Sequence, residues 1–119
     1  MKKTSLLLLL LGSFAASLFA QAPQFINYQG VARNASGVPF ANQTISVRLT
    51  IRDGSSAGAA LYSETRAVLT NQFGIFTIVI NSAGATAVSG NFTTINWGVA
   101  ARFLQVEIDP AGGSSFTNL

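Results

Sequence analysis

Apolar and polar residues alternate with a period of two along several short stretches, which is the pattern of strands with one buried and one wet face. The clearest stretches are 44–52 and 102–109. The apolar positions are Ile45, Val47, Leu49 and Ile51 in the first, and Leu104, Val106 and Ile108 in the second. The residues between them, including Gln105, Glu107 and Asp109, are expected to form wet faces.

Residues 61–80 are the stretch around which the rest of the chain is expected to pack. Two runs of β-branched and aromatic residues flank a polar turn at 70–74, which contains Asn71 and Gly74. This predicts a β-hairpin. On its second strand Phe76, Ile78 and Ile80 share one face, which is expected to be buried.

The remaining patterns complete an all-β chain. We expect a first strand at 25–33, with Gly30 as a bulge or a point of close approach. Turns are predicted at 34–37 and 53–60, and a long loop at 81–98 with its aromatic residues packed against the end of the sandwich. Residues 114–119 read as the start of a strand that the chain does not complete. This order of short strands predicts an antiparallel β-sandwich, either immunoglobulin-like or prealbumin-like.

The first twenty residues are interpreted as a secretory signal peptide. Met1-Lys2-Lys3 is basic, residues 6–11 are all leucine, and small residues follow. This order is typical of a signal helix that is cleaved on export. Cleavage is expected after Ala20 or, less readily, after Ala22. The prediction is therefore a signal peptide at 1–20, a sandwich domain at 21–119 truncated at its C-terminal strand, an extracellular or cell-surface location, and no membrane span after cleavage.

The charge and the residue types of the chain argue against several classes of function. Once Lys2 and Lys3 are removed with the signal peptide, the chain has five arginines and four carboxylates, which gives a net charge of +1. The arginines are scattered singly, whereas a nucleic-acid-binding surface clusters them, so no nucleic-acid partner is expected. The chain has no cysteine and no histidine. Disulfides, the commonest metal ligands and the commonest general base are therefore excluded, and we expect no enzyme, no cofactor and no metal.

Two carboxylate arrangements could argue against this expectation. Glu107 and Asp109 lie two residues apart and could form an acid–base pair at a strand end. The simpler interpretation is the wet face of a strand. Asp53 and Asp109 could supply some of the oxygens that Ca²⁺ requires, but no calcium-loop spacing is present.

Aromatic residues give the one ligand hypothesis. Trp97, Tyr28 and Tyr62 could stack on the rings of a surface glycan, whereas the simpler interpretation places them in the core or at its end. Tyr62, Glu64 and Arg66 share one face of their strand, and we interpret Glu64 and Arg66 as a neighbour pair on a solvated face.

Five spaced blocks resemble the N-terminal module of secreted surface proteins common in Bacteroidetes. The blocks are 26–33 (INYQGVAR), 61–65 (LYSET), 70–76 (TNQFGIF), 95–98 (INWG) and 103–109 (FLQVEID). The resemblance implies a module that precedes varied C-terminal parts and has no established catalytic residues. At the level of fold, the chain is also similar to prealbumin-like and carboxypeptidase-regulatory domains.

The resulting hypothesis is a non-enzymatic exported module with a structural or adhesive role. The alternative is a carbohydrate-binding module that uses exposed aromatic residues. An open sheet edge left by the incomplete last strand is expected to recruit a strand from a protein partner.

Overall fold

The alternating residues form strands in the computed structural model, which describes residues 24–119. The predicted signal peptide lies outside the described residues. The elements, in chain order, are β1 (Ile26–Val31), β2 (Thr44–Asp53), β3 (Ala60–Leu69), β4 (Ile75–Ile80), β5 (Ala87–Gly90), the 3₁₀ turn η1 (Phe92–Thr94), β6 (Arg102–Asp109) and β7 (Thr117–Asn118).

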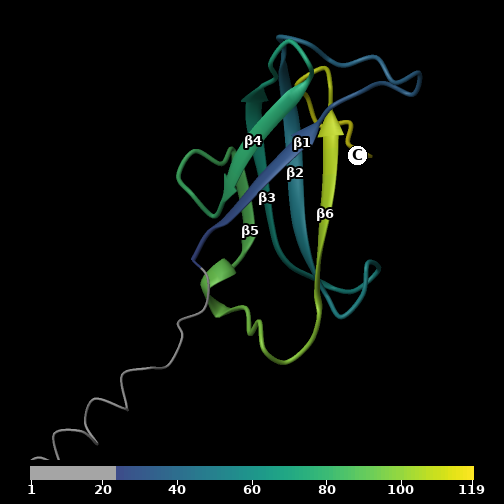
Figure 1. Cartoon of the computed structure of the whole chain (residues 1–119). Coiled ribbons are helices and arrows are strands. Elements are labelled where there is room, and N and C mark those ends of the chain that lie inside the picture. Colours follow the sequence, from purple (N-terminus) through teal and green to yellow (C-terminus); the bar gives the residue numbers. More distant parts are fainter. Residues whose placement is uncertain (1–23) are drawn as a thin grey trace, which may run out of the picture.

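These strands form two antiparallel sheets. The larger sheet has the order β5-β3-β2-β6-β7, and the smaller one consists of β1 and β4. The smaller sheet lies diagonally across one face of the larger sheet (Figure 1). The all-β sandwich predicted from the sequence is thereby confirmed. No helix in residues 24–119 is long and apolar enough to cross a membrane.

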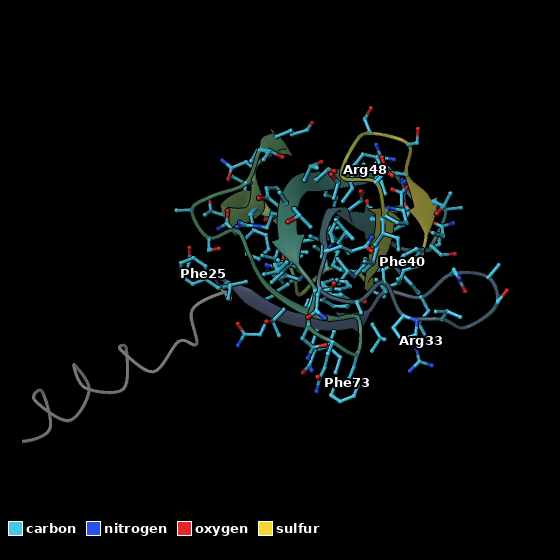
Figure 2. The ribbon with its side chains drawn as sticks, turned by 90° about the horizontal axis from the view of Figure 1, so that it is seen from above. Phe25, Arg33, Phe40, Arg48 and Phe73 are labelled. Atoms are coloured by element: carbon cyan, nitrogen blue, oxygen red, sulfur yellow. The ribbon has the colours of Figure 1, made fainter. Side chains whose placement is uncertain are left out.

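The core lies between the two sheets and is built from the alternating positions that the sequence indicated. Ile45, Val47, Leu49 and Ile51 of β2 are all buried, and so are Phe76, Ile78 and Ile80 of β4. Burying one such side chain contributes about 1.5–3 kcal/mol. Seen from above, side chains fill the space between the sheets (Figure 2).

The predicted hairpin at 61–80 is wrong. Strands β3 and β4 belong to different sheets, because β3 pairs with β2 and β5 whereas β4 pairs with β1. The segment between them therefore crosses from one layer to the other. Both edges of β3 are occupied, so β4 has no free edge of β3 to join.

The crossing turn is nevertheless held by the residues that suggested a hairpin. The Asn71 side-chain oxygen accepts hydrogen bonds from the backbone N–H groups of Phe73 and Ile75, at 2.8 and 3.0 Å. The Thr70 hydroxyl donates to the carbonyl of Phe40 at 2.5 Å, and its N–H donates to Gln43 at 3.0 Å. Thr70 thus ties the crossing to the segment before β2. A polar turn of this composition suits a hairpin and a crossing equally well.

Of two other local predictions, one is confirmed and one is confirmed in part. Gly30 is a point of close approach, as predicted, because a Cβ atom there would lie 2.6 Å from the ring of Phe76. The prediction of a long loop at 81–98 is only partly confirmed. Residues 87–90 form β5, which pairs with β3. The aromatic residues of this loop do pack as predicted, since Phe92 is buried and contacts Trp97.

The predicted wet faces also need correction. Ser46 and Thr50 are buried on the outer face of β2, because β2 is the central strand and neighbouring side chains cover it. Asp109 is buried as well. Conversely, Leu104 lies on the core face of β6 but is 39% exposed, because the two strands of the smaller sheet do not cover all five strands of the larger one.

Gly74, in the crossing turn, gives a prediction about stability. Its φ is +76°, and a Cβ atom would lie 2.6 Å from the Ala32 carbonyl oxygen. Gly74→Ala should lower the free energy of unfolding by about 2–4 kcal/mol, from left-handed strain and overlap together. The control is Gly37→Ala, with φ +83° and no atom within 4 Å. It should cost only about 1–2 kcal/mol of strain. Urea unfolding of both variants measures the difference, and equal losses would contradict the close approach.

Candidate functional site

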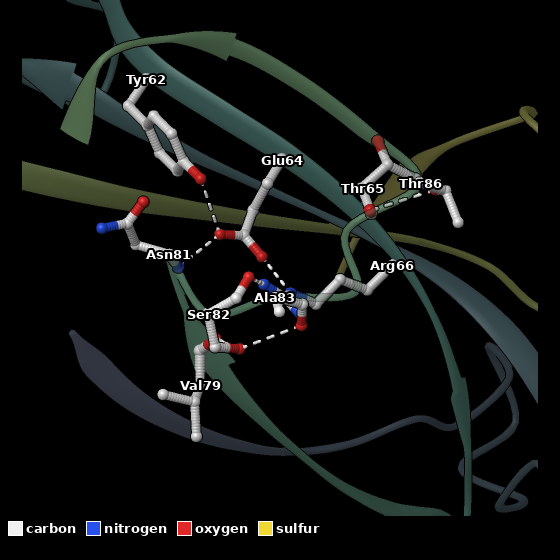
Figure 3. Close-up of polar contacts among 9 residues, drawn as sticks. All are labelled: Tyr62, Glu64, Thr65, Arg66, Val79, Asn81, Ser82, Ala83 and Thr86. Carbon is white, nitrogen blue, oxygen red and sulfur yellow. Dashed lines mark hydrogen bonds and ion pairs between the residues drawn. The ribbon is translucent and has the colours of Figure 1, made fainter.

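A buried carboxylate, Glu64, is the centre of the most extensive side-chain polar cluster in the described residues. Its Oε1 accepts a hydrogen bond from the Tyr62 hydroxyl at 2.9 Å and another from the Asn81 backbone N–H at 2.6 Å. Its Oε2 is paired with Nε of Arg66. Glu64 is 1% exposed, Tyr62 3% and Arg66 8%. Figure 3 shows the carboxylate between these two neighbours on β3.

The same cluster joins the two sheets. Besides Glu64, the Arg66 guanidinium binds two backbone carbonyls in the turn after β4, those of Ala83 at 3.0 Å and Ser82 at 2.5 Å. Glu64 holds the start of that turn through Asn81. Strand β3 belongs to the larger sheet and β4 to the smaller one. The ion pair therefore fixes the end of β4 against the larger sheet (Figure 3).

The interpretation of Glu64 and Arg66 as a solvated-face pair is thus wrong. The reason lies in the pairing of β2 with β3, in which Tyr62, Glu64 and Arg66 stand opposite Ile51, Leu49 and Val47. Directly opposed residues of an antiparallel pair share a face, so these three side chains lie on the core face. The available signal was the match between this row and the apolar row of β2.

The environment of Tyr62 changes its acidity. Burial, followed by the hydrogen bond to Glu64, raises the pKa of Tyr62 from 10.0 to about 12. Burial also raises the pKa of Tyr28. In both cases the neutral phenol is favoured over the phenolate, because burial penalises the charged form.

This shift predicts a stability change at alkaline pH. The folded-state pKa of Tyr62, about 12, exceeds the ordinary value of 10.0. The stability that the neutral Tyr62 phenol contributes is therefore complete below pH 10 and is lost as pH rises through about 12. Tyr28→Phe leaves Tyr62 as the sole tyrosine. Its tyrosinate absorbance should then rise with a midpoint near 12. Urea midpoints should fall over the same range, and less so in Tyr62→Phe. A midpoint near 10 in a chain that remains folded by circular dichroism would contradict the burial of Tyr62.

The three aromatic residues proposed for glycan stacking do not form one surface. Tyr62 is buried, and its ring packs edge to face against the ring of Phe92, with the ring centroids 5.5 Å apart. Trp97 is half-buried against the same phenylalanine at 5.5 Å. Tyr28 lies in the smaller sheet beside Phe76, at 6.0 Å. Tyr62, Phe92 and Trp97 form one aromatic row, and of these Trp97 alone is not fully buried.

The carboxylates weighed for catalysis or calcium have structural contacts. Glu107 forms a two-bond ion pair with Arg48 on the outer face of the larger sheet, at 3.0 and 2.8 Å. Asp109 accepts the backbone N–H groups of Ala111 and Ser115, each at 3.0 Å, and so closes the turn before β7. Asp53 is paired with Arg102. Within residues 24–119 no three candidate metal ligands gather at one place.

The described part of the chain is therefore a β-sandwich whose carboxylates hold strands and turns together. The chain belongs to the family described as a domain of unknown function (DUF8740), whose model matches residues 27–118. No curated protein and no solved structure matches it significantly.

Proposed function

We propose that this chain is an exported, non-enzymatic module with a structural or adhesive role in a cell-surface or secreted protein. The observation that carries the proposal is the engagement of all four carboxylates of the chain, which are Asp53, Glu64, Glu107 and Asp109. General acid–base chemistry needs a carboxylate that reaches a substrate proton, whereas each of these holds an arginine or a backbone turn.

The sequence supports the location. The basic start, the leucine run and the small residues that follow have the order of a secretory signal. The resemblance of five blocks to N-terminal modules of Bacteroidetes surface proteins points in the same direction. A module of this kind acts through contacts with other polypeptides.

Export of the full chain tests this proposal. Expressed in a bacterium with a C-terminal tag, the chain should appear outside the cytoplasm and begin at Gln21 or Pro23, as read by N-terminal sequencing. The control replaces Leu8 and Leu9 with arginine, which interrupts the apolar run and should keep the chain inside with Met1 intact. Recovery of the unaltered chain from the cytoplasm with an uncleaved N-terminus would contradict the proposal.

The carbohydrate-binding alternative rests on Trp97, which is half-buried at the end of the aromatic row. Because Trp97 is the single tryptophan of the chain, its fluorescence reports this place alone. We expect no change in emission when oligosaccharides typical of bacterial surfaces are added, since Tyr62 is buried and Tyr28 lies in the other sheet. Saturable quenching that is lost in Trp97→Ala would favour the alternative.

A further inference from the structure

The smaller sheet has an open edge on the side where the larger sheet is incompletely covered. Strand β1 pairs with β4 and with no other strand of the described residues. The Ala32 N–H donates to the carbonyl of Gly74, at the β4 side of the ladder. Backbone groups alternate along an antiparallel strand, so those of Asn27, Gln29 and Val31 point away from β4. Such a row is a template for another strand.

A groove begins where this edge ends. It has a volume of about 520 Å³ and runs between the end of β1 and the β6–β7 pair, with Val31, Phe40, Ile108 and Leu119 among its walls. Beyond it, Leu104 is 39% exposed although it shares the core face of β2, since it pairs opposite Ile51. One more strand beside β1 would have its inward side chains directed toward this uncovered part of the core face.

The charge of Arg33 indicates which kind of strand the groove would bind. The arginines Arg48, Arg52, Arg66 and Arg102 each bind an acceptor in the fold. Arg33 also lines the groove, and no hydrogen bond or ion pair occupies its guanidinium within residues 24–119. Figure 2 shows it projecting from the segment that follows β1. A free guanidinium at the end of an apolar groove matches a carboxylate on the incoming chain.

We propose that the β1 edge binds an extended strand of a partner polypeptide, with apolar residues at alternate positions and a carboxylate that reaches Arg33. The backbone bonds supply affinity, and the groove and Arg33 supply selection, as in other cases of strand addition. The inference rests on the proposed function, because a structural module acts by contacting other chains.

The probe is a short peptide of alternating valine and threonine that ends in glutamate, and the control peptide ends in lysine. Both are acetylated at the N-terminus and amidated at the C-terminus, so only the glutamate peptide carries a carboxylate. Binding to the mature chain is followed by fluorescence anisotropy of a labelled peptide. The glutamate peptide should bind at least about tenfold more tightly than the lysine peptide. Arg33→Glu should reverse this preference.

A second variant tests the backbone contact. Gln29→Pro removes an N–H that points away from β4, so the β1–β4 ladder is kept while the edge is blocked. It should abolish binding, whereas Gln29→Ala should not, and circular dichroism checks that both are folded. If proline disturbs the fold, the reversal in Arg33→Glu still decides the question.

Three outcomes would overturn the inference. They are no binding of either peptide at millimolar concentration, equal binding of both peptides, and a wild-type dimer in sedimentation that Gln29→Pro dissolves, since a second copy would then occupy the edge. None of these bears on export and signal cleavage, which test the proposed function separately.

Discussion

Replacing Glu64 with glutamine is expected to lower the free energy of unfolding by about 3–5 kcal/mol. The substitution keeps the size of the side chain but leaves Arg66 buried without its counter-charge. It also weakens the hydrogen bonds from Tyr62 and Asn81, which are given to a carboxylate oxygen in the wild type. Small domains have only about 5–15 kcal/mol of stability in total. The variant should therefore be only marginally folded.

Urea unfolding followed by circular dichroism measures this loss. The matched control is Glu107→Gln, the same substitution in a pair whose arginine, Arg48, has a side chain that is 39% exposed and remains solvated. It should cost only about 0–1 kcal/mol. Replacing both partners, in Glu64→Leu with Arg66→Met, should recover part of the stability, because no unpaired charge remains buried. A Glu64→Gln chain as stable as the Glu107→Gln chain would show that the Glu64–Arg66 pair is solvated.

The second large effect is expected from Phe92→Ala, with a loss of about 3–5 kcal/mol. Phe92 is among the largest buried side chains, although it lies in a 3₁₀ turn between strands. Its ring is in contact with both Tyr62 and Trp97. Truncation removes the ring and leaves a cavity between the two neighbours, and the loop from β5 to β6 loses its anchor.

Two readouts separate this effect from a general loss of stability. The first is the unfolding free energy, and the second is the emission of Trp97, which should move to longer wavelength in the still-folded variant as water reaches the indole. The control is Phe103→Ala, because Phe103 is 42% exposed. It should cost less than about 1 kcal/mol and leave the emission of Trp97 unchanged. An unshifted emission in Phe92→Ala would mean that Trp97 is packed by other residues.

The buried ion pair also shows where reasoning from the sequence reached its limit. Alternation predicts that Tyr62, Glu64 and Arg66 share one face of a strand, but the two charges among them favour a solvated face. What reversed this was the register with β2, which places the row opposite Ile51, Leu49 and Val47. Charges are rarely buried unless they are paired, and the pairing here includes a turn far away in the sequence.

The glycan-stacking hypothesis also depends on tertiary contacts that the sequence does not show. Residue type alone groups Tyr28, Tyr62 and Trp97, whereas the fold divides them between two sheets and a loop. Phe92 contacts both Tyr62 and Trp97, but in the sequence it is only one aromatic residue of a predicted long loop. The sequence predicts an open edge at the last strand, and β7 does lie at one end of the larger sheet. The free edge of β1 is not predicted, because strand neighbours cannot be read from local patterns.

The sequence by itself determined which residues of β2, β4 and β6 face the core, since side chains alternate with period two and apolar side chains avoid water. It also determined the all-β class and the close approach at Gly30. Only the tertiary structure decided which strands pair, that the turn at Asn71 to Gly74 crosses between sheets, and that Glu64 is buried. The physical reason is that faces and turns are set by neighbouring residues, whereas strand pairing is set by competition among distant edges, which leaves β1 with one edge unpaired.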